Sequence, residues 1–474
     1  MNRRTIVFFI LGAALAFGAQ GQEYSSINIS RNNKTTYRTS FGSSNFQVES
    51  RGKFELSDDD KDIKSMSPDG YLEITKTVFG NRRSVVITPG SNGPKYEYYE
   101  GRTQVAFEPD GRKWLSEILP EVVQNTTIGA ESRVNRFYKQ GGTKRVLDEM
   151  GRMESDHVKT HYASLLMGLN IPEKEYSTVI TKFTDMTDSD HYRTEFLKKN
   201  LSKFLLNKEA TEAMFTATQK MESDHYKTEV IKEALRSGPA TIENVKIVLQ
   251  AASTMESDHY KSEVLNSLLR QNNLNDAVIA EMISATKSIE SDHYRSQVLK
   301  RALGKEGLSP TSYMRVVESV KDIESDHYKT EVLTDLLRNN MTPEAQANLI
   351  NVVTSIESDH YITTVANEMI KRQNLTDDVF QKLLDAIGQH DSDYYVSVFL
   401  KNAMERPNLS KQNIAAILNA AANMESDHYI TEVLSEVAPR IKSLNDASLR
   451  DAYRLAAKKI ESDTYYGRAM KAIE

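Results

Sequence analysis

The chain has 474 residues, with 60 Lys and Arg against 66 Asp and Glu, so its formal net charge is −6. This near balance excludes a generally basic nucleic-acid-binding protein. The mean hydropathy of −0.52 excludes a protein with several membrane spans. Cysteine is absent, which excludes disulfides, thiolate metal sites and cysteine nucleophiles. Only 21 Gly and 11 Pro interrupt this long chain, so we expect helices to dominate.

The first residues have the pattern of an export signal. Two arginines are followed by an apolar stretch from Ile6 to Phe17, and small and polar residues come next. The apolar stretch is too short to be a permanent membrane anchor. We therefore expect residues 1–21 to be a signal peptide. The mature protein would be periplasmic or extracellular, with no stable membrane anchor after cleavage.

The next part of the chain has the composition of a small sheet. Residues 22–51 are polar and indicate a linker or an irregular first strand. Residues 52–112 alternate apolar runs with Gly, Pro and Asp turns, which predicts a small antiparallel β domain of four or five strands. The acidic run at 58–62 lacks the ligand spacing of a calcium loop, and we interpret it as a solvated turn. Residues 113–142 are expected to be bridging helices.

The dipeptide Ser-Asp then recurs ten times, mostly at intervals of 34 residues. Its aspartates are Asp156, Asp190, Asp224, Asp258, Asp292, Asp326, Asp359, Asp393, Asp427 and Asp463. Such a period accommodates two helices of about a dozen residues with two turns. Residues 143–474 are therefore predicted to form an α-solenoid of about ten helical hairpins. The predicted fold class is α+β, mostly α.

The dipeptide lies where the second helix of each hairpin, helix B, should begin after the first, helix A. We predict that these aspartates are N-caps, because a carboxylate at that position accepts a backbone N–H and complements the helix dipole. A His-Tyr pair follows in most copies. Helical phase places Tyr328 on the same broad face as Leu333, so the tyrosine is predicted to be a core residue.

The same phase places the repeated histidine on the opposite side, often one turn before a glutamate. The predicted ribbon contains His191, Glu195, His225, Glu229, His259, Glu263, His293, His327, Glu331, His360, His428 and Glu432. Three interpretations remain open: contact between repeats, a partner-binding surface, or metal or pH sensing. Packed helices lie about 8 to 10 Å apart, so adjacent histidines are too distant to share a metal ion. His157 and His161 lack a third ligand, and no metal or cofactor is expected.

No catalytic motif is recognisable. The sequence contains no HExxH, GxSxG or Walker motif, and its polar residues recur by repeat instead of converging on one place. We expect a non-enzymatic exported bacterial protein that binds a protein or peptide partner in the cell envelope along the solenoid surface. The alternatives are a pH-responsive envelope sensor, a metal-binding repeat array, and a hydrolase with an unrecognised site.

Two family resemblances are present. The helical repeat is similar in size to HEAT-like and tetratricopeptide solenoids, although it lacks the tetratricopeptide signature. The stretch GKFELSDDDKDIKSMSPDGYLEI at 52–74, with the following ESDHY repeats, resembles extracytoplasmic portions of bacterial antirepressor-type membrane metallopeptidases and exported proteins of Bacteroidetes-type bacteria. The zinc motif of those peptidases is absent, so the resemblance implies a sensing or binding module without peptidase activity.

Overall fold

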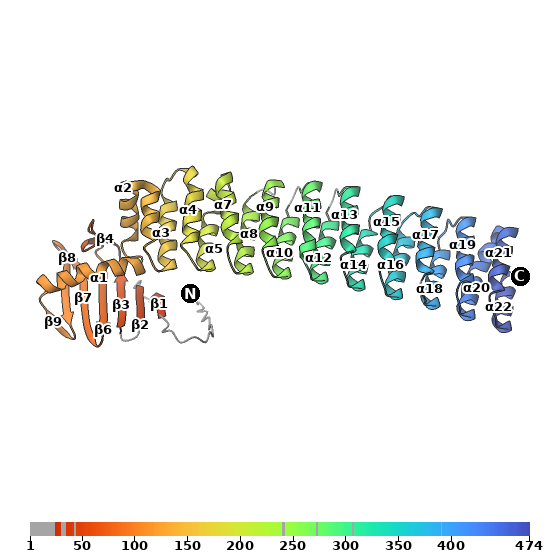
Figure 1. The fold of residues 1–474 in the computed structure, drawn as a ribbon, viewed down its shortest axis with the longest axis horizontal. Helices are drawn as coiled ribbons and strands as arrows, with labels where there is room; N and C mark the ends of the chain where they lie inside the picture. The colour runs from red at the N-terminus through yellow and green to blue at the C-terminus, as the bar shows by residue number, and fades with distance from the viewer. Residues whose placement is uncertain are drawn as a thin grey trace, which may run out of the picture. The chain divides into compact units, whose positions relative to one another are not determined.

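The computed structural model describes residues 24–29, 35–41, 44–238, 242–271, 274–305, 308–389 and 391–474 (Figure 1). The predicted signal peptide lies outside these ranges. The chain divides into two compact units, Met1–Asn200 and Leu201–Glu474. The first unit contains an antiparallel sheet and the first helical hairpins, and the second consists of helical hairpins.

The main sheet has seven antiparallel strands in the order β1-β2-β3-β6-β7-β8-β9, and β4 and β5 form a separate pair. The strands are β1 (Tyr24–Ile29), β2 (Thr35–Phe41), β3 (Ser44–Arg51), β4 (Phe54–Leu56), β5 (Ile63–Met66), β6 (Tyr71–Val78), β7 (Asn81–Gly90), β8 (Gly93–Glu100) and β9 (Thr103–Val105). The prediction of a linker or one irregular strand at 22–51 was therefore wrong. That segment contributes β1, β2 and β3, because its polar residues alternate with the few apolar side chains that enter the core.

One face of the sheet forms the core of the first unit. Val48, Ile74, Val85 and Tyr98 are paired across four adjacent strands, and each is at most 1% exposed. Helix α1 (Arg112–Asn125) runs across this face (Figure 1) and buries Leu115, with other apolar side chains, against it. The helix supplies the second layer that a small sheet requires for stability.

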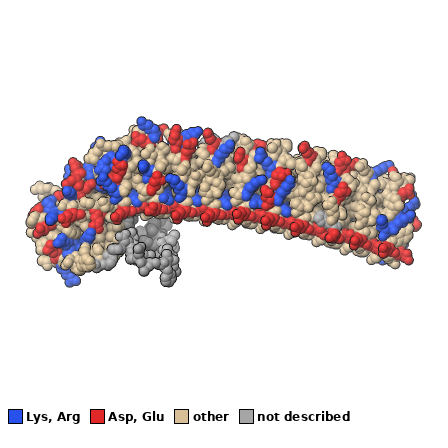
Figure 2. All heavy atoms as spheres, in the orientation of Figure 1, with Lys and Arg blue, Asp and Glu red and all other residues tan. Residues whose placement is uncertain are grey.

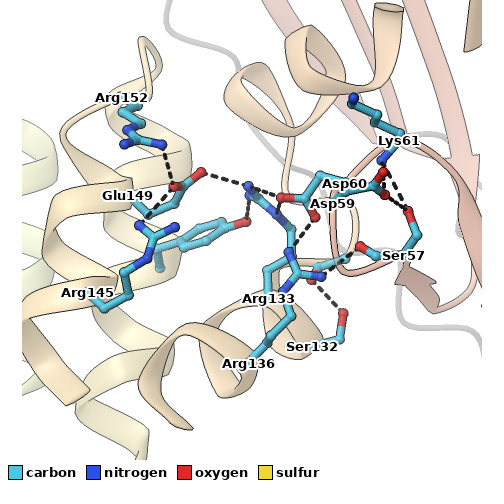
Figure 3. A network of polar contacts seen from close by, with 12 residues as sticks. Ser57, Asp59, Asp60, Lys61, Ser132, Arg133, Arg136, Arg145, Glu149 and Arg152 are labelled. Atoms are coloured by element: carbon cyan, nitrogen blue, oxygen red, sulfur yellow. Dashed lines mark hydrogen bonds and ion pairs between the residues drawn. The ribbon is translucent and has the colours of Figure 1, made fainter. Parts of the chain in front are cut away.

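A buried ionic network holds the turn between β4 and β5 (Figure 3). Asp60 accepts ion-paired hydrogen bonds from Arg133 at 2.9 Å and from Arg136 at 2.6 Å. The Arg133 side chain is 2% exposed, and it also pairs with Glu149 at 2.8 Å and donates to the Tyr162 hydroxyl. The interpretation of the acidic run as a solvated turn was wrong for Asp60, because two arginines of helix α2 (Ala130–Met150) bind its carboxylate.

The remaining helices of the first unit lead into the repeats. They are α2 (Ala130–Met150), α3 (Asp156–Gly168), α4 (Tyr176–Asp185) and α5 (Asp190–Lys199), with the short turns η1 (Phe107–Gly111) and η2 (Glu173–Glu175). Helical geometry is broken inside α2 at Gly141 and Gly142, where Gly142 has a φ of 63°. This break falls where the bridging helices were predicted to end and the first repeat to begin.

The second unit is a helical solenoid, and its architecture confirms the predicted fold class. Its helices are α6 (Leu201–Phe204), α7 (Lys208–Gln219), α8 (Asp224–Ser237), α9 (Ile242–Ser253), α10 (Asp258–Leu269), α11 (Asp276–Ala285), η3 (Thr286–Ser288), α12 (Asp292–Leu303), α13 (Pro310–Val320), α14 (Asp326–Leu336), α15 (Pro343–Val353), α16 (Asp359–Arg372), α17 (Asp377–Ile387), α18 (Asp393–Met404), α19 (Lys411–Ala422), α20 (Asp427–Leu444), α21 (Ala447–Ala457) and α22 (Asp463–Ile473). Odd-numbered helices from α7 onward are helices A, and the following even-numbered helices are helices B.

The two helices of a hairpin begin differently. Helix A usually starts after a side-chain cap; the Thr342 hydroxyl, for example, accepts the N–H of Ala345 at 3.3 Å. In helix B the N-cap residue is the serine of the repeated dipeptide, and its side chain makes no capping bond. The aspartate is the first helical residue, and its carboxylate is free to bind elsewhere.

Candidate functional site at the turn between helices A and B

The repeated aspartate joins each hairpin to the next. In the second unit, the Asp224 carboxylate accepts the backbone N–H groups of Glu256 and Ser257, both at 2.8 Å. Equivalent bonds within each unit are made by Asp156, Asp258, Asp292, Asp326, Asp393 and Asp427, with donor to acceptor distances from 2.5 to 3.1 Å. The carboxylate therefore binds the A–B turn of the following repeat.

The predicted N-cap role of these residues was therefore wrong. Helices B begin at Asp156, Asp190, Asp224, Asp258, Asp292, Asp326, Asp359, Asp393, Asp427 and Asp463. A side chain at the first helical position still lies at the positive end of the helix dipole. Sequence reasoning placed the carboxylate correctly along the chain, but the N–H groups that donate to it lie one period away.

A buried cation three residues later completes this link in the earlier repeats. Lys227, which is 5% exposed, donates to Asp224 at 3.3 Å and to the carbonyl of Thr254 in the next turn at 3.2 Å. Lys261 and Lys329 bridge in the same way. Sequence reasoning missed these residues, although a basic side chain at the same offset in six copies was a visible signal.

The histidine and tyrosine rings form a continuous aromatic ladder in the second unit. Most tyrosine rings contact the histidine of their own repeat and that of the preceding one; Tyr294, for example, lies 5.1 Å from His293 and 5.6 Å from His259 between ring centroids. Tyr394 takes the histidine position in its repeat and contacts Tyr395 and Tyr429. The aromatic ladder consists of His225, Tyr226, Tyr260, His259, Tyr294, His293, Tyr328, His327, Tyr361, His360, Tyr395, Tyr394, Tyr429, His428 and Tyr465.

The prediction that the repeated tyrosines are core residues was wrong. Tyr328 is half-buried, whereas Val332, Leu333 and Leu336 on the same helix are fully buried. At 100° per residue, Tyr328 lies about 90° from the centre of the buried face, which explains its position at the margin. Its hydroxyl lies 3.2 Å from Nδ1 of His293 in the preceding repeat.

The predicted ribbon is exposed, but only part of it forms direct His/Glu pairs. Nε2 to Oε1 distances are 3.8 Å for His225 and Glu229 and 3.4 Å for His428 and Glu432. His327 and Glu331 also lie 3.8 Å apart.

The remaining ribbon positions differ from this arrangement. His293 contacts Gln297, and Glu263 pairs with Lys232 of the preceding repeat at 3.2 Å. Glu432 pairs in the same way with Lys401 of the preceding repeat, at 2.7 Å. Several ribbon glutamates therefore connect neighbouring repeats.

A second row of carboxylates is exposed beside the aromatic ladder. From the repeat of Asp258 onward, it consists of the acidic residue two positions before the repeated aspartate, namely Glu256, Glu290, Glu324, Glu357, Asp391, Glu425 and Glu461. None of these has an ion-pair partner among the described residues of the second unit. Figure 2 shows acidic side chains in a continuous line along this edge of the hairpins. We call these seven residues the acidic row.

The remaining candidate sites are weaker. Within the described ranges, no group of three or more His, Asp or Glu side chains is arranged to hold a metal ion, and no helix is long and apolar enough to cross a membrane. His157 and His161 line a cavity of about 460 Å³ in the first unit. Partial burial in its wall, and then the nearby His157, lower the pKa of His161.

Comparisons with known proteins identify no family. No protein-family model and no curated protein matches the chain. One similar solved structure, "Computational Design of Self-Assembling Cyclic Protein Homooligomers", is 15% identical, covers 67% of this chain and 93% of its own, and has a TM-score of 0.10. Another, "Circular tandem repeat protein with novel repeat topology and enhanced subunit contact surfaces", is 10% identical, covers 77% and 78%, and has a TM-score of 0.13. Scores this low carry no argument about function.

Proposed function

We propose that this chain is a non-enzymatic binding protein of the bacterial cell envelope, exported through its signal peptide, whose solenoid binds an extended cationic segment of a partner protein. The observation that supports this proposal is the acidic row, which places one exposed carboxylate without an ion-pair partner in each of seven successive repeats of the second unit. The resemblance of 52–74 to extracytoplasmic modules supports the envelope location.

The chemistry beside the acidic row favours a cation as well. The aromatic ladder follows the same turns, and rings such as Tyr260 and Tyr294 are half-buried instead of enclosed. Lysine and arginine are attracted to aromatic faces, by about 0.5 to 1 kcal/mol at exposed sites. A cationic side chain that reaches this edge can therefore meet a carboxylate and a ring together.

The periodicity favours an extended partner. Packed helices are about 8 to 10 Å apart, and an extended chain advances about 3.3 Å per residue. Successive carboxylates of the acidic row would then match about every third residue of the partner. Many individually weak contacts can add along such an array.

The test compares two fluorescent peptides of identical composition, one with Lys at every third position and one with its Lys residues in a single block. We expect the evenly spaced peptide to bind more tightly, with an affinity that falls as salt rises. Equal affinity for the two peptides would contradict the periodic match. Absence of binding for both would overturn the proposal.

A charge-reversed variant locates the surface. Replacing Glu256, Glu290, Glu324 and Glu357 by Lys should weaken binding of the spaced peptide at least about tenfold. The matched control reverses four exposed acids on helices A, namely Glu209, Glu281, Glu344 and Asp378. Both variants change the net charge equally, so a similar loss in both would show non-specific attraction instead of an edge site.

A pH-responsive sensor is a second candidate, favoured by the three close His/Glu pairs. Protonation of His327 or His428 would strengthen its contact with the adjacent glutamate and change the charge of the same edge. Peptide affinity measured across about pH 5.5 to 8 tests this function. A flat profile would exclude it while leaving the binding role intact.

A further inference from the structure

The first A–B turn lacks the carboxylate that the later turns bind. In the first repeat the two residues before helix B are Glu154 and Ser155, and their backbone N–H groups donate to no acceptor among the described residues of the first unit. One repeat later, the equivalent N–H groups of Asp188 and Ser189 donate to Asp156 at 3.0 and 2.9 Å.

The unpaired turn has the same backbone conformation as the turns that bind a carboxylate. Ser155 has φ and ψ of −80° and 120°, and Ser257, which donates to Asp224, has −81° and 119°. Ser325, which donates to Asp292, has −72° and 118°. The first turn is therefore already in the binding conformation, with its donors in place.

A cavity of about 700 Å³ lies against this turn. Its wall includes Glu154 and Ser155, the half-buried ring of Tyr192 and, from the sheet side, Phe46 and Thr39. The volume is in the range of pockets that enclose small ligands or a few residues of a peptide. In the later repeats, the first turn of the preceding helix B occupies the corresponding place.

The charges of the cavity define the ligand further. Two of its carboxylates are paired, Glu121 with Lys76 at 2.6 Å and Asp156 with Lys159 at 3.0 Å. Glu154 is exposed and has no ion-pair partner within the described part of the first unit. A simple anion would be repelled by this acidic rim. A ligand that carries its own cation beside the carboxylate would be attracted to it, as the Asp224 and Lys227 pair of a helix B illustrates.

We propose that this cavity binds a carboxylate-bearing ligand that also carries a cationic group, with the backbone N–H groups of Glu154 and Ser155 as the donors to the carboxylate. The ligand is either a peptide turn with an acid and a base one helical turn apart or a small zwitterion. This site is independent of the acidic row, and neither proposal requires the other.

The experiment uses the full chain and two probes. The first is a blocked peptide with the sequence of residues 223–237, which contains the Asp224 and Lys227 pair, and the second is free L-lysine. Binding is measured by calorimetry. We expect the peptide to bind and its D224N version to bind at least about tenfold more weakly, because the charge-assisted bonds to the two N–H groups are lost. Binding of L-lysine would assign the site to small zwitterions, whereas binding of the peptide alone would assign it to a protein partner.

Ser155→Pro identifies the donors. Proline has no N–H, and the φ of −80° at Ser155 is close to the value that its ring imposes. We expect this variant to lose at least about tenfold in affinity for whichever probe binds. Ser155→Ala keeps the N–H and should bind as the parent does.

Three results would overturn the site: no binding of either probe at millimolar concentration, equal affinity for the parent and D224N peptides, or full affinity in a folded Ser155→Pro protein. If Ser155→Pro does not fold, as judged by circular dichroism, the comparison of the two peptides on the parent chain decides the question.

Discussion

The carboxylate of Asp224 and the backbone N–H of Ser257 are joined at 2.8 Å, although they belong to successive repeats. A link of this kind makes each hairpin depend on its neighbour. The stability of a solenoid is the sum of repeat stabilities and interface contributions. Changes to the linking residues should therefore affect stability more than changes to equally exposed residues at the end of the array.

Asp292→Ala tests the link. The Asp292 carboxylate accepts N–H groups of Glu324 at 3.0 Å and Ser325 at 2.8 Å, and its loss should cost about 2 kcal/mol. Asp463 occupies the same position in the last helix, where no described turn follows. Asp463→Ala therefore controls for the helix-dipole effect. Urea unfolding followed by far-UV circular dichroism should show a lower midpoint for Asp292→Ala; equal midpoints would contradict the linking role.

Gln373→Leu tests a second link at the opposite end of the helices B. Gln373 is 5% exposed, donates to the carbonyls of Leu337 at 2.8 Å and Asn339 at 2.9 Å, and accepts the N–H of Met341 at 3.0 Å. Leucine has a similar size and leaves three backbone groups unpaired, so we expect a loss of about 2 to 4 kcal/mol. The exposed Gln412→Leu should change unfolding by less than about 0.5 kcal/mol. A similarly small effect at Gln373 would show that water replaces its bonds.

Arg133→Met tests the buried network of the first unit. The substitution leaves Asp60 and Glu149 without their shared buried cation, and removing one partner of such a network costs about 3 to 5 kcal/mol. Trp114, the only tryptophan in the chain, lies in the core of this unit, so its fluorescence follows the unfolding of the unit specifically. Arg102→Met, at an exposed turn, is the control. A loss near that of the control would mean that the network contributes little net stability.

The sequence was sufficient to predict the solenoid because its evidence is local and repeated. The period of 34 residues, the caps before helices A and the apolar positions of helices such as α14 all indicate helical hairpins. Strands β1 to β3 were harder to predict, because their inward side chains, such as Tyr37 and Phe46, alternate with polar residues too sparsely to distinguish a strand from a linker.

The contacts between repeats were not predictable in the same way. The phase of one helix shows which side chains leave the core, but it does not show what they meet one period later. The Asp224 carboxylate looked like a cap because the partner turn at Ser257 is 33 positions away. Similarly, the ionic network formed by Asp60 and Arg133 connects residues 73 positions apart, and no spacing rule joins them.

Asp276→Asn tests a third link between repeats through its pH dependence. The Asp276 carboxylate accepts bonds from the hydroxyl of Ser312 at 2.5 Å, and from the hydroxyl and N–H of Ser309 at 2.7 and 3.0 Å, in the following helix A. These bonds, first those from the Ser312 and Ser309 hydroxyls, lower the pKa of Asp276 in the folded protein. The stabilisation is therefore complete above the unfolded pKa of about 3.9, and is lost as the pH falls through the lower folded value.

We expect the parent to have the higher urea midpoint at neutral pH, and the gap to Asp276→Asn to close as the pH falls below about 4. Measuring midpoints of both proteins over this range removes the acid sensitivity that they share. Ser312→Ala removes one of the two hydroxyl donors to the Asp276 carboxylate. The difference in urea midpoint between Ser312→Ala and the double variant Ser312→Ala/Asp276→Asn should therefore change less with pH than the difference between the parent and Asp276→Asn. A gap between parent and Asp276→Asn that stays constant with pH would show that the carboxylate acts through shape instead of charge.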